Sequence, residues 1–160
     1  MQTPEVGEAY RGVEGHSGYL LRQAWYAFRN AMDAALREEG LSGVQYAVLS
    51  VLARDPGMSG ADLARVCNTT PQAMNGVLTT LEREALVARR AHPQHGRILQ
   101  VFLTEEGRRR LDRATPRVRA VERSVEAGRT GTEMSAVKEW LVDTARRLDR
   151  TVPPGGTTAV

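Results

Sequence analysis

Two opposed stripes run along the segment from Thr69 to Val87. Apolar residues recur there at the spacing that places them on one face of a helix, namely Met74, Val77, Leu78, Leu81 and Ala85. Polar residues with the same spacing fall on the opposite face, namely Gln72, Asn75, Gly76, Thr79 and Arg83. Thr70 can cap the helix through its hydroxyl, and Pro71 suits the first helical position. The pattern predicts an amphipathic helix whose exposed face is polar but almost uncharged.

Two β-prone runs follow this helix, at about 87–92 and 97–103, with Pro-Gln-His-Gly between them. Pro and Gly in this position indicate a turn, so the segment is expected to form a β-hairpin. Leu99, Val101 and Leu103 alternate along the second run, which predicts one buried face on that strand. Basic and histidine side chains line the strands near the tip and the tip itself, namely Arg89, Arg90, His92, His95 and Arg97.

Three helices are expected before this pair of elements. The first covers 17–39 with an apolar stripe through Leu21, Trp25, Phe28, Met32, Ala35 and Leu36, and Gly40 is its stop. The second covers 42–54, where Ser42 and Gln45 fit a capping box. A short third helix covers 59–66 and is expected to bury Leu63 and Val66.

Two long helices are expected after the hairpin. Thr104 can cap the first, and Pro116 in its middle should kink it or divide it in two. The last helix is expected from Thr132 to about Arg150, with buried residues at Val137, Trp140, Leu141, Ala145 and Leu148. The first helix and the last two carry long apolar stripes, and one small chain has too little apolar surface to cover all of them. We therefore expect them to pair with the same helices of a second copy, in a two-fold dimer.

Composition narrows the class of protein only modestly. With 160 residues, 41% of them hydrophobic, the chain is expected to form one mainly α-helical domain with a core. A net charge of +3 neither requires nor excludes nucleic acid. The sequence has no stretch long enough to cross a membrane and no signal peptide, so we expect a cytoplasmic protein.

Candidate reactive residues are few. The single cysteine, Cys67, excludes an internal disulfide, and we interpret it as a small buried thiol rather than a redox sensor, which would need a resolving thiol. The three histidines, His16, His92 and His95, have no nucleophile beside them. His92 and His95 have no third ligand nearby, which makes them a poor metal pair. We expect neither an enzyme, nor a cofactor, nor a metal site.

A short helix, a tight turn, a second helix and a basic hairpin form the sequence pattern of a winged helix-turn-helix. From about Tyr19 to Arg150 the chain resembles the MarR family of bacterial transcriptional regulators. The matching positions are Leu41-Ser42 with Gln45 and Val48-Leu49, Leu63-Ala64, Leu81-Glu82 with Leu86-Val87 and Arg89, then Arg97, and Leu103-Thr104 with Gly107.

The resemblance implies a division into a flexible N-terminus (1–16), a helical dimerisation region (17–40 and 104–150), a winged helix-turn-helix DNA-binding region (41–103) and a flexible tail (151–160). The chain departs from the family pattern in three places. His95-Gly96-Arg97 replaces the usual Asp-Arg-Arg of the wing tip, and Gly76 and Thr80 stand where the recognition helix often carries Arg. Ala85 stands where a helix-ending Gly is common.

We interpret the chain as a sequence-specific, homodimeric duplex-DNA-binding regulator, a repressor that a small-molecule effector releases from a pseudo-palindromic site. Asn and Gln can pair with adenine edges and Thr offers a hydroxyl and a methyl, so the candidate base contacts are Thr70, Gln72, Asn75, Gly76 and Thr79. Candidate phosphate or wing contacts are Arg65, Thr69, Arg83, Arg89, Arg90, His95 and Arg97.

The resemblance also implies a pocket for a small aromatic or anionic effector, between the dimer helices and the DNA-binding lobe. Its candidate residues are Tyr19, Trp25, Tyr26, Arg29 and Tyr46. Trp25 and Phe28 share the apolar stripe of their helix, so a purely structural role is the alternative for both. The alternative for the whole chain is a winged-helix protein-interaction module without DNA binding, which the neutral helix face and its missing Arg favour.

Overall fold

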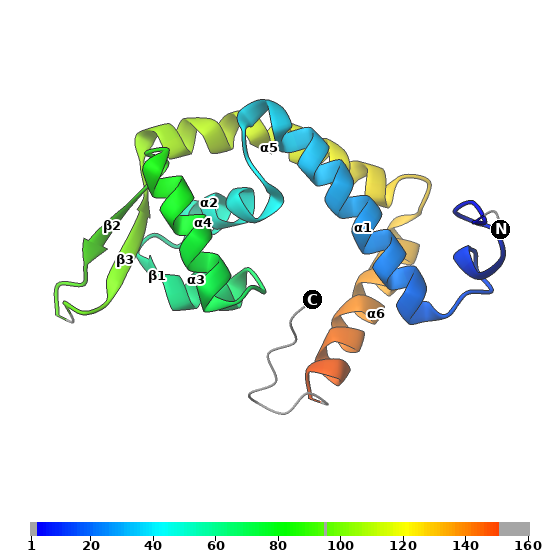
Figure 1. Cartoon of the computed structure of the whole chain (residues 1–160). Coiled ribbons are helices and arrows are strands. Elements are labelled where there is room, and N and C mark those ends of the chain that lie inside the picture. Colours follow the sequence, from blue (N-terminus) through cyan, green and yellow to red (C-terminus); the bar gives the residue numbers. More distant parts are fainter. Residues whose placement is uncertain (1–2, 95, 151–160) are drawn as a thin grey trace. The chain divides into compact units, whose positions relative to one another are not determined.

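The computed structural model describes residues 3–94 and 96–150 (Figure 1). Its elements are η1 (Ala9–Arg11), α1 (Ser17–Leu36), η2 (Arg37–Glu39), α2 (Gly43–Arg54), β1 (Met58–Ser59), α3 (Gly60–Val66), α4 (Pro71–Arg83), β2 (Val87–Ala91), β3 (Leu99–Leu103), α5 (Glu105–Glu126) and α6 (Gly131–Asp149). Between Glu122 and Arg123 the chain divides into two compact units. The mainly helical fold with a small sheet is the predicted one.

The core of the first unit is continuous from α1 to α5. Its largest fully buried side chains are Leu36, Leu49, Leu52, Leu63, Met74, Leu81, Leu86, Val48 and Val101. They come from five elements and from the turn after α4, so one apolar cluster fixes the helix-turn-helix against the sheet. The apolar face predicted for α4 is confirmed for Met74, Leu78 and Leu81, and Val77 is half-buried against the same cluster. Its fifth predicted member, Ala85, is exposed, because the helix ends at Arg83 and the chain turns there.

The sheet has three antiparallel strands in the order β1-β3-β2. Along the hairpin, Val87 pairs with Leu103 and Ala91 pairs with Leu99. The two-residue strand β1 adds Met58 opposite Val101. Sequence patterning predicted the hairpin and missed β1, because two residues cannot display an alternating pattern.

Capping interactions define the helix starts. The predicted capping box of α2 is present: Ser42 Oγ accepts from Gln45 N at 3.3 Å, and Gln45 Oε1 accepts from Ser42 N at 2.8 Å. Thr70 Oγ1 accepts from Ala73 N at 3.1 Å, which confirms the predicted cap of α4. The predicted start of α6 at Thr132 is wrong. Thr130 caps this helix, because Glu133 three residues later completes a capping box with it.

The end of α4 is locked to the start of α5. Ala85 has the left-handed φ of 55°, and Leu86 N donates to Leu81 O at 2.9 Å, which closes the helix end. Thr104 Oγ1 donates to Ala85 O at 2.7 Å and accepts from Gly107 N at 3.0 Å, as an N-cap of α5. A Cβ at Gly107 would lie 2.1 Å from Leu86 O, so only glycine permits this approach.

Several burial predictions fail in the described chain. Val66 and Leu99 are exposed, because α3 turns Leu63 and Ala64 inward and the tip of the hairpin extends past the core. Leu21 and Trp25 on α1 are exposed as well. The predicted buried stripe of α6 is also wrong for the single chain, since each of its five members is exposed, namely Val137, Trp140, Leu141, Ala145 and Leu148.

Two backbone expectations also differ from the structure. Pro116 does not divide α5, which runs unbroken over 22 residues, because a proline removes one hydrogen bond from an otherwise complete helix. In the segment expected to be flexible, residues 3–16 contain η1, and Arg11 Nε donates to Gln23 Oε1 of α1 at 2.9 Å. Residues 151–160, the expected tail, lie outside the described residues.

Candidate nucleic-acid interface

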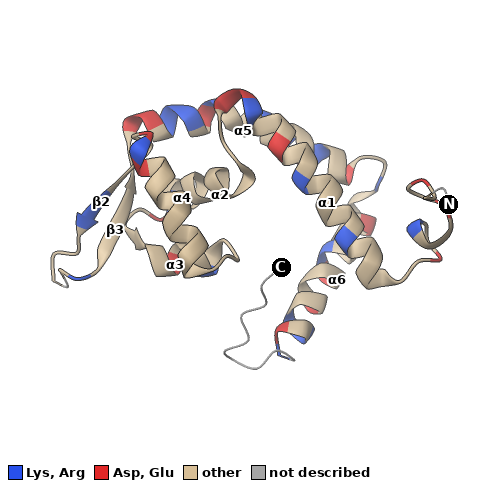
Figure 2. Ribbon diagram, viewed as in Figure 1, with Lys and Arg blue, Asp and Glu red and all other residues tan. Residues whose placement is uncertain are grey.

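Helix α4 presents its two stripes to different surroundings. Met74, Leu78 and Leu81 are at most 2% exposed, and they anchor the helix on the core. The opposite face is exposed along its whole length and consists of Gln72, Asn75, Gly76, Thr79 and Arg83. In Figure 2 the body of α4 is tan, and charged residues appear only near its C-terminal end. The helix therefore displays hydrogen-bonding groups without charge repulsion or bulk.

Arg89 on β2 reaches across to this face of α4. Its Nη1 donates to Asn75 Oδ1 at 3.3 Å and its Nη2 donates to Thr79 Oγ1 at 3.3 Å. Its Nε lies 3.3 Å from Glu82 Oε2, and the Arg89 side chain is only 19% exposed. The structure thus places this predicted phosphate or wing contact against the exposed polar face of α4, hydrogen-bonded to two candidate base contacts.

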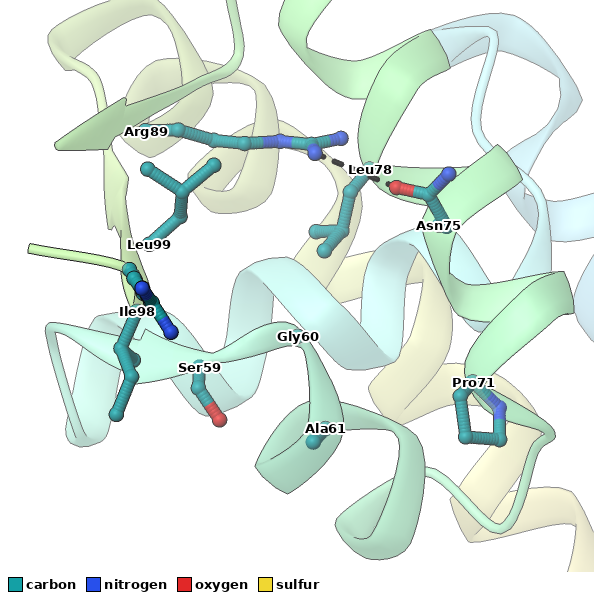
Figure 3. Close-up of a pocket in the computed structure, with 10 residues that line it drawn as sticks. Ser59, Gly60, Ala61, Pro71, Asn75, Leu78, Arg89, Ile98 and Leu99 are labelled. Carbon is teal, nitrogen blue, oxygen red and sulfur yellow. Dashed lines mark hydrogen bonds between the residues drawn. The ribbon is translucent and has the colours of Figure 1, made fainter. Parts of the chain in front are cut away.

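A hollow of about 470 Å³ separates the wing from the start of α4. Asn75 and Leu78 line one side, and Arg89 and Leu99 come from the wing, as the close-up shows (Figure 3). Arg97 of the wing also lines the hollow. Arg97 is exposed at the rim of this hollow. The arrangement provides a polar helix face, an apolar floor and a basic rim within one concave surface, which suits contact with a polyanion.

The other predicted contacts lie at the margins of this surface. Arg65 is exposed on α3 and pairs with Asp62, whose pKa is lowered by the hydrogen bond from Ser59 and then by Arg65. Arg90 is exposed and stacks over the Phe102 ring at 5.2 Å. The remaining exposed members are Thr70 and Arg83, and Thr69 is half-buried. His95 lies outside the described residues.

A second hollow, of about 680 Å³, lies within the first unit among α1, α2 and α5. Of the predicted effector residues, Trp25, Arg29 and Tyr46 line it. Tyr19 and Tyr26 are not among its lining residues, and Tyr19 instead packs edge-on against Tyr10. The five predicted residues therefore divide three to two between the wall of the hollow and other parts of α1.

Sequence reasoning missed several polar groups in this second hollow. Asp33 lines it, and Asp33 Oδ1 accepts a hydrogen bond from Gly43 N at 3.3 Å. Ser50 contributes a hydroxyl that is buried without a hydrogen-bond partner. Cys67 also lines it, and burial raises the pKa of the thiol. These residues belong to different elements, so no spacing along the chain could have grouped them.

Two further expectations concern a metal site and a membrane-spanning helix, neither of which the sequence predicts. Among the described residues, no group of three or more His, Cys, Asp or Glu side chains is placed to hold a metal ion. No helix in the described ranges combines the length and the apolar character that crossing a membrane requires.

Comparison with known proteins gives consistent results. A family model described as the MarR family matches residues 39–98. The chain is 40% identical over 124 residues to the HTH-type transcriptional repressor Rv2887 of Mycobacterium tuberculosis, covering 78% of this chain and 89% of that protein. It is 31% identical over 122 residues to the homoprotocatechuate degradative operon repressor of Escherichia coli, covering 76% and 82%.

A solved structure supports the same relationship. The crystal structure of the Mycobacterium tuberculosis MarR family protein Rv2887 in complex with salicylic acid is 38% identical to this chain, with a TM-score of 0.63. The match covers 81% of this chain and 96% of the other. The curated relatives named above are transcriptional regulators, which is a non-enzymatic role.

Proposed function

The chain belongs to the MarR family of transcriptional regulators, and from this premise we propose that it is a homodimeric repressor that binds a specific duplex DNA site. Each α4 enters a major groove and each wing reaches towards the adjacent minor groove. A two-fold dimer then requires a pseudo-palindromic site whose half-sites lie about one helical turn, roughly 10 bp, apart.

The uncharged polar face of α4 beside the basic wing is the observation that supports this function most strongly. Base edges are read by hydrogen-bonding side chains, whereas phosphates are held by basic ones. Gln72, Asn75 and Thr79 on α4 supply the first kind of group. Arg97 at the rim of the 470 Å³ hollow supplies the second.

Dimerisation is supported by the apolar face of α6. None of the described residues of this helix is buried in the single chain, and Trp140 and Leu141 are 45% and 41% exposed. Exposed apolar surface of this kind marks an interaction site. A second copy of the chain supplies a matching apolar helix, and a two-fold pairing gives the symmetry that a pseudo-palindromic site requires.

Control by an effector is supported by the 680 Å³ hollow, which has the size of a small-molecule site. Trp25, Phe28 and Tyr46 offer aromatic surface, and Arg29 offers a positive charge to a small aromatic anion. The related Mycobacterium tuberculosis protein forms a complex with salicylic acid. In this chain a ligand bound there shifts the balance of conformations away from the one that docks both recognition helices.

A salt titration of duplex binding tests the DNA-binding function. The parent protein should lose affinity steeply as salt rises, and Arg97→Ala should weaken binding to every sequence and reduce the log–log salt slope by about 1. Asn75→Ala should relax the choice of base at one position of each half-site. Arg22→Ala on α1 is the matched control and should bind like the parent.

The same titration separates this function from its alternative. A winged-helix protein-interaction module would bind duplex DNA weakly, without a preferred sequence. If Arg97→Ala and Asn75→Ala both bind a selected site as the parent does, the interface is assigned to the wrong surface.

Calorimetry with salicylate as the probe tests the second hollow: Arg29→Gln should weaken salicylate binding and Arg22→Gln should not.

A further inference from the structure

We propose that Arg89 is a positioning residue that fixes which hydrogen-bonding groups Asn75 and Thr79 present to the bases. This inference rests on the proposed DNA-binding function and adds a base preference to it. It also changes the role expected from the sequence, where Arg89 is a candidate phosphate or wing contact.

The geometry around Arg89 is that of an internal tether. The side chain leaves β2 and crosses above Leu78 and Leu99 to reach α4, as Figure 3 shows. Its two Nη atoms hold Asn75 and Thr79 at 3.3 Å each, and its Nε faces Glu82 at 3.3 Å. These three partners lie on one side of α4 at positions i, i+4 and i+7. The contact of Nε with Glu82 is an ion pair without a hydrogen bond, whereas the two Nη groups of the planar guanidinium each donate to one acceptor on α4.

The tether fixes the polarity of the Asn75 amide. A guanidinium can only donate hydrogen bonds, so the Asn75 atom that faces it must be the carbonyl oxygen Oδ1. The Nδ2 group then points away from Arg89, as its orientation in the close-up shows (Figure 3). Asn75 therefore offers a donor to the groove, and one lone pair of its acceptor is already occupied.

The same contacts limit what Thr79 can offer. Its hydroxyl donates to the backbone oxygen of Asn75 at 2.9 Å and accepts from Arg89 at 3.3 Å. A hydroxyl has one hydrogen, so Thr79 cannot also donate to a base. What remains for the groove is its methyl group and one lone pair.

These restrictions predict a base preference at the position that Asn75 contacts. An amide donor fits the major-groove acceptors O6 and N7 of guanine or O4 of thymine, and a threonine methyl fits the thymine methyl. Adenine also offers N7 to this donor, but the bidentate pairing with adenine that the sequence suggested needs Oδ1 turned to the same base to accept from N6, and Oδ1 is turned to Arg89. Guanine instead offers a second acceptor, O6, where adenine has the N6 donor. We therefore expect guanine or thymine in preference to adenine.

A positioning role also predicts how the salt dependence of DNA binding changes when Arg89 is replaced. Its charge is paired with Glu82 and largely shielded from solvent, so it neutralises no phosphate. Removal of a phosphate contact lowers the affinity for all sequences and reduces the salt slope. A positioning residue changes the base preference and leaves the salt slope unchanged.

The test compares Arg89→Met with Arg97→Met, using bound sequences selected from random duplexes and the salt slope on the parent's selected site. Arg89→Met should reduce the preference for guanine or thymine over adenine beneath Asn75 by about tenfold, with an unchanged slope. Arg97→Met should keep the base preference and reduce the slope by about 1. Arg22→Met is the control for removing an arginine elsewhere.

Two further variants keep the result interpretable. Arg89→Met with Glu82→Gln removes both charges, so the loss of base preference must persist after the ion pair is gone. Arg89→Lys keeps the charge without the fork and should also lose the preference. The inference is overturned if Arg89→Met keeps the parent's base preference, or if it loses affinity uniformly with a shallower slope. A parent protein that selects no duplex overturns the proposed function itself.

Discussion

Helices α4 and α6 carry similar amphipathic patterns and have opposite environments. On α4, Met74 and Leu81 are fully buried, whereas Trp140 and Leu141 on α6 are more than 40% exposed. The period of apolar residues therefore determines that a helix forms and which face it uses. It does not determine whether the partner of that face belongs to the same chain.

The difference follows from what each helix packs against. Helix α4 is enclosed by α3, β2 and the core residues of α2, so its apolar face is covered within the first unit. Helix α6 contributes no buried residue to the described chain. In our proposal α4 reads DNA because its other face is left exposed, and α6 dimerises because its apolar face is left exposed.

Replacing a core residue of α4 should have the largest effect. Leu78→Ala removes a side chain that is 2% exposed and should lower the free energy of unfolding by about 3 kcal/mol, through lost burial and the cavity left behind. Denaturant unfolding measures this. The loss should not depend on protein concentration, whereas the matched change Leu141→Ala on α6 should act only where dimers are present. Identical behaviour of the two variants would remove the distinction between these helices.

A charge on the exposed face of α6 should break the dimer. Trp140→Asp places a carboxylate in the proposed interface and should weaken dimerisation by about 2 kcal/mol, roughly thirtyfold. Sedimentation equilibrium measures this, and operator affinity should fall in parallel. Glu139→Ala, on the same helix but outside the stripe, is the control. A monomeric parent protein would contradict the dimer directly.

Relief of strain at the end of α4 should stabilise the protein. Ala85 has φ of 55°, a conformation that glycine adopts more readily, so Ala85→Gly should raise the free energy of unfolding by about 1 kcal/mol. Thermal unfolding checks this. Ala88→Gly on β2 is a suitable control and should destabilise, because its backbone is extended. A lower melting temperature for Ala85→Gly would show that the turn does not need a left-handed residue.

Gly76 provides a sharper test of the exposed face of α4. A Cβ at this position would meet nothing within 4 Å in the chain, so Gly76→Ala should stabilise the helix by about 0.5–1 kcal/mol. If the backbone approaches DNA here, the same variant should bind its operator more weakly. Unfolding and binding are measured on one preparation. A gain in both would mean that the glycine has no role at the interface.

The smallest effect concerns Cys67. Burial raises the pKa of its thiol, so less thiolate is present at neutral pH and alkylation by iodoacetamide should be slower than for an exposed cysteine. Because the folded pKa lies above that of the unfolded chain, this contribution to stability is present at neutral pH and lost as pH rises through the folded pKa. Labelling equal to that of the unfolded protein would contradict the burial.

Most of the fold was predictable because local chemistry determines it. Ser42, Thr70 and Gly40 occupy the helix boundaries that their capping and turn preferences indicate. The start of α6 was misplaced because Thr130 and Thr132 are equally good caps in isolation. Only the position of Glu133 relative to Thr130 decides between them.

The candidate site was predictable in its residues and not in its contacts. Periodicity placed Asn75 and Thr79 on the exposed face, and the structure agrees. The tether from Arg89 joins residues 14 and 10 positions apart across two elements, and it depends on how β2 packs against α4. Contacts of this kind have no period in the sequence.

Selection of bound sequences from random duplex DNA tests whether the protein binds DNA as a two-fold dimer, since it reports binding, symmetry and spacing in one measurement. A two-fold dimer should select two inverted half-sites whose centres lie about one helical turn apart, roughly 10 bp. Recovery of unselected sequence, or of a single half-site without a symmetric partner, would contradict a dimer that reads DNA through α4.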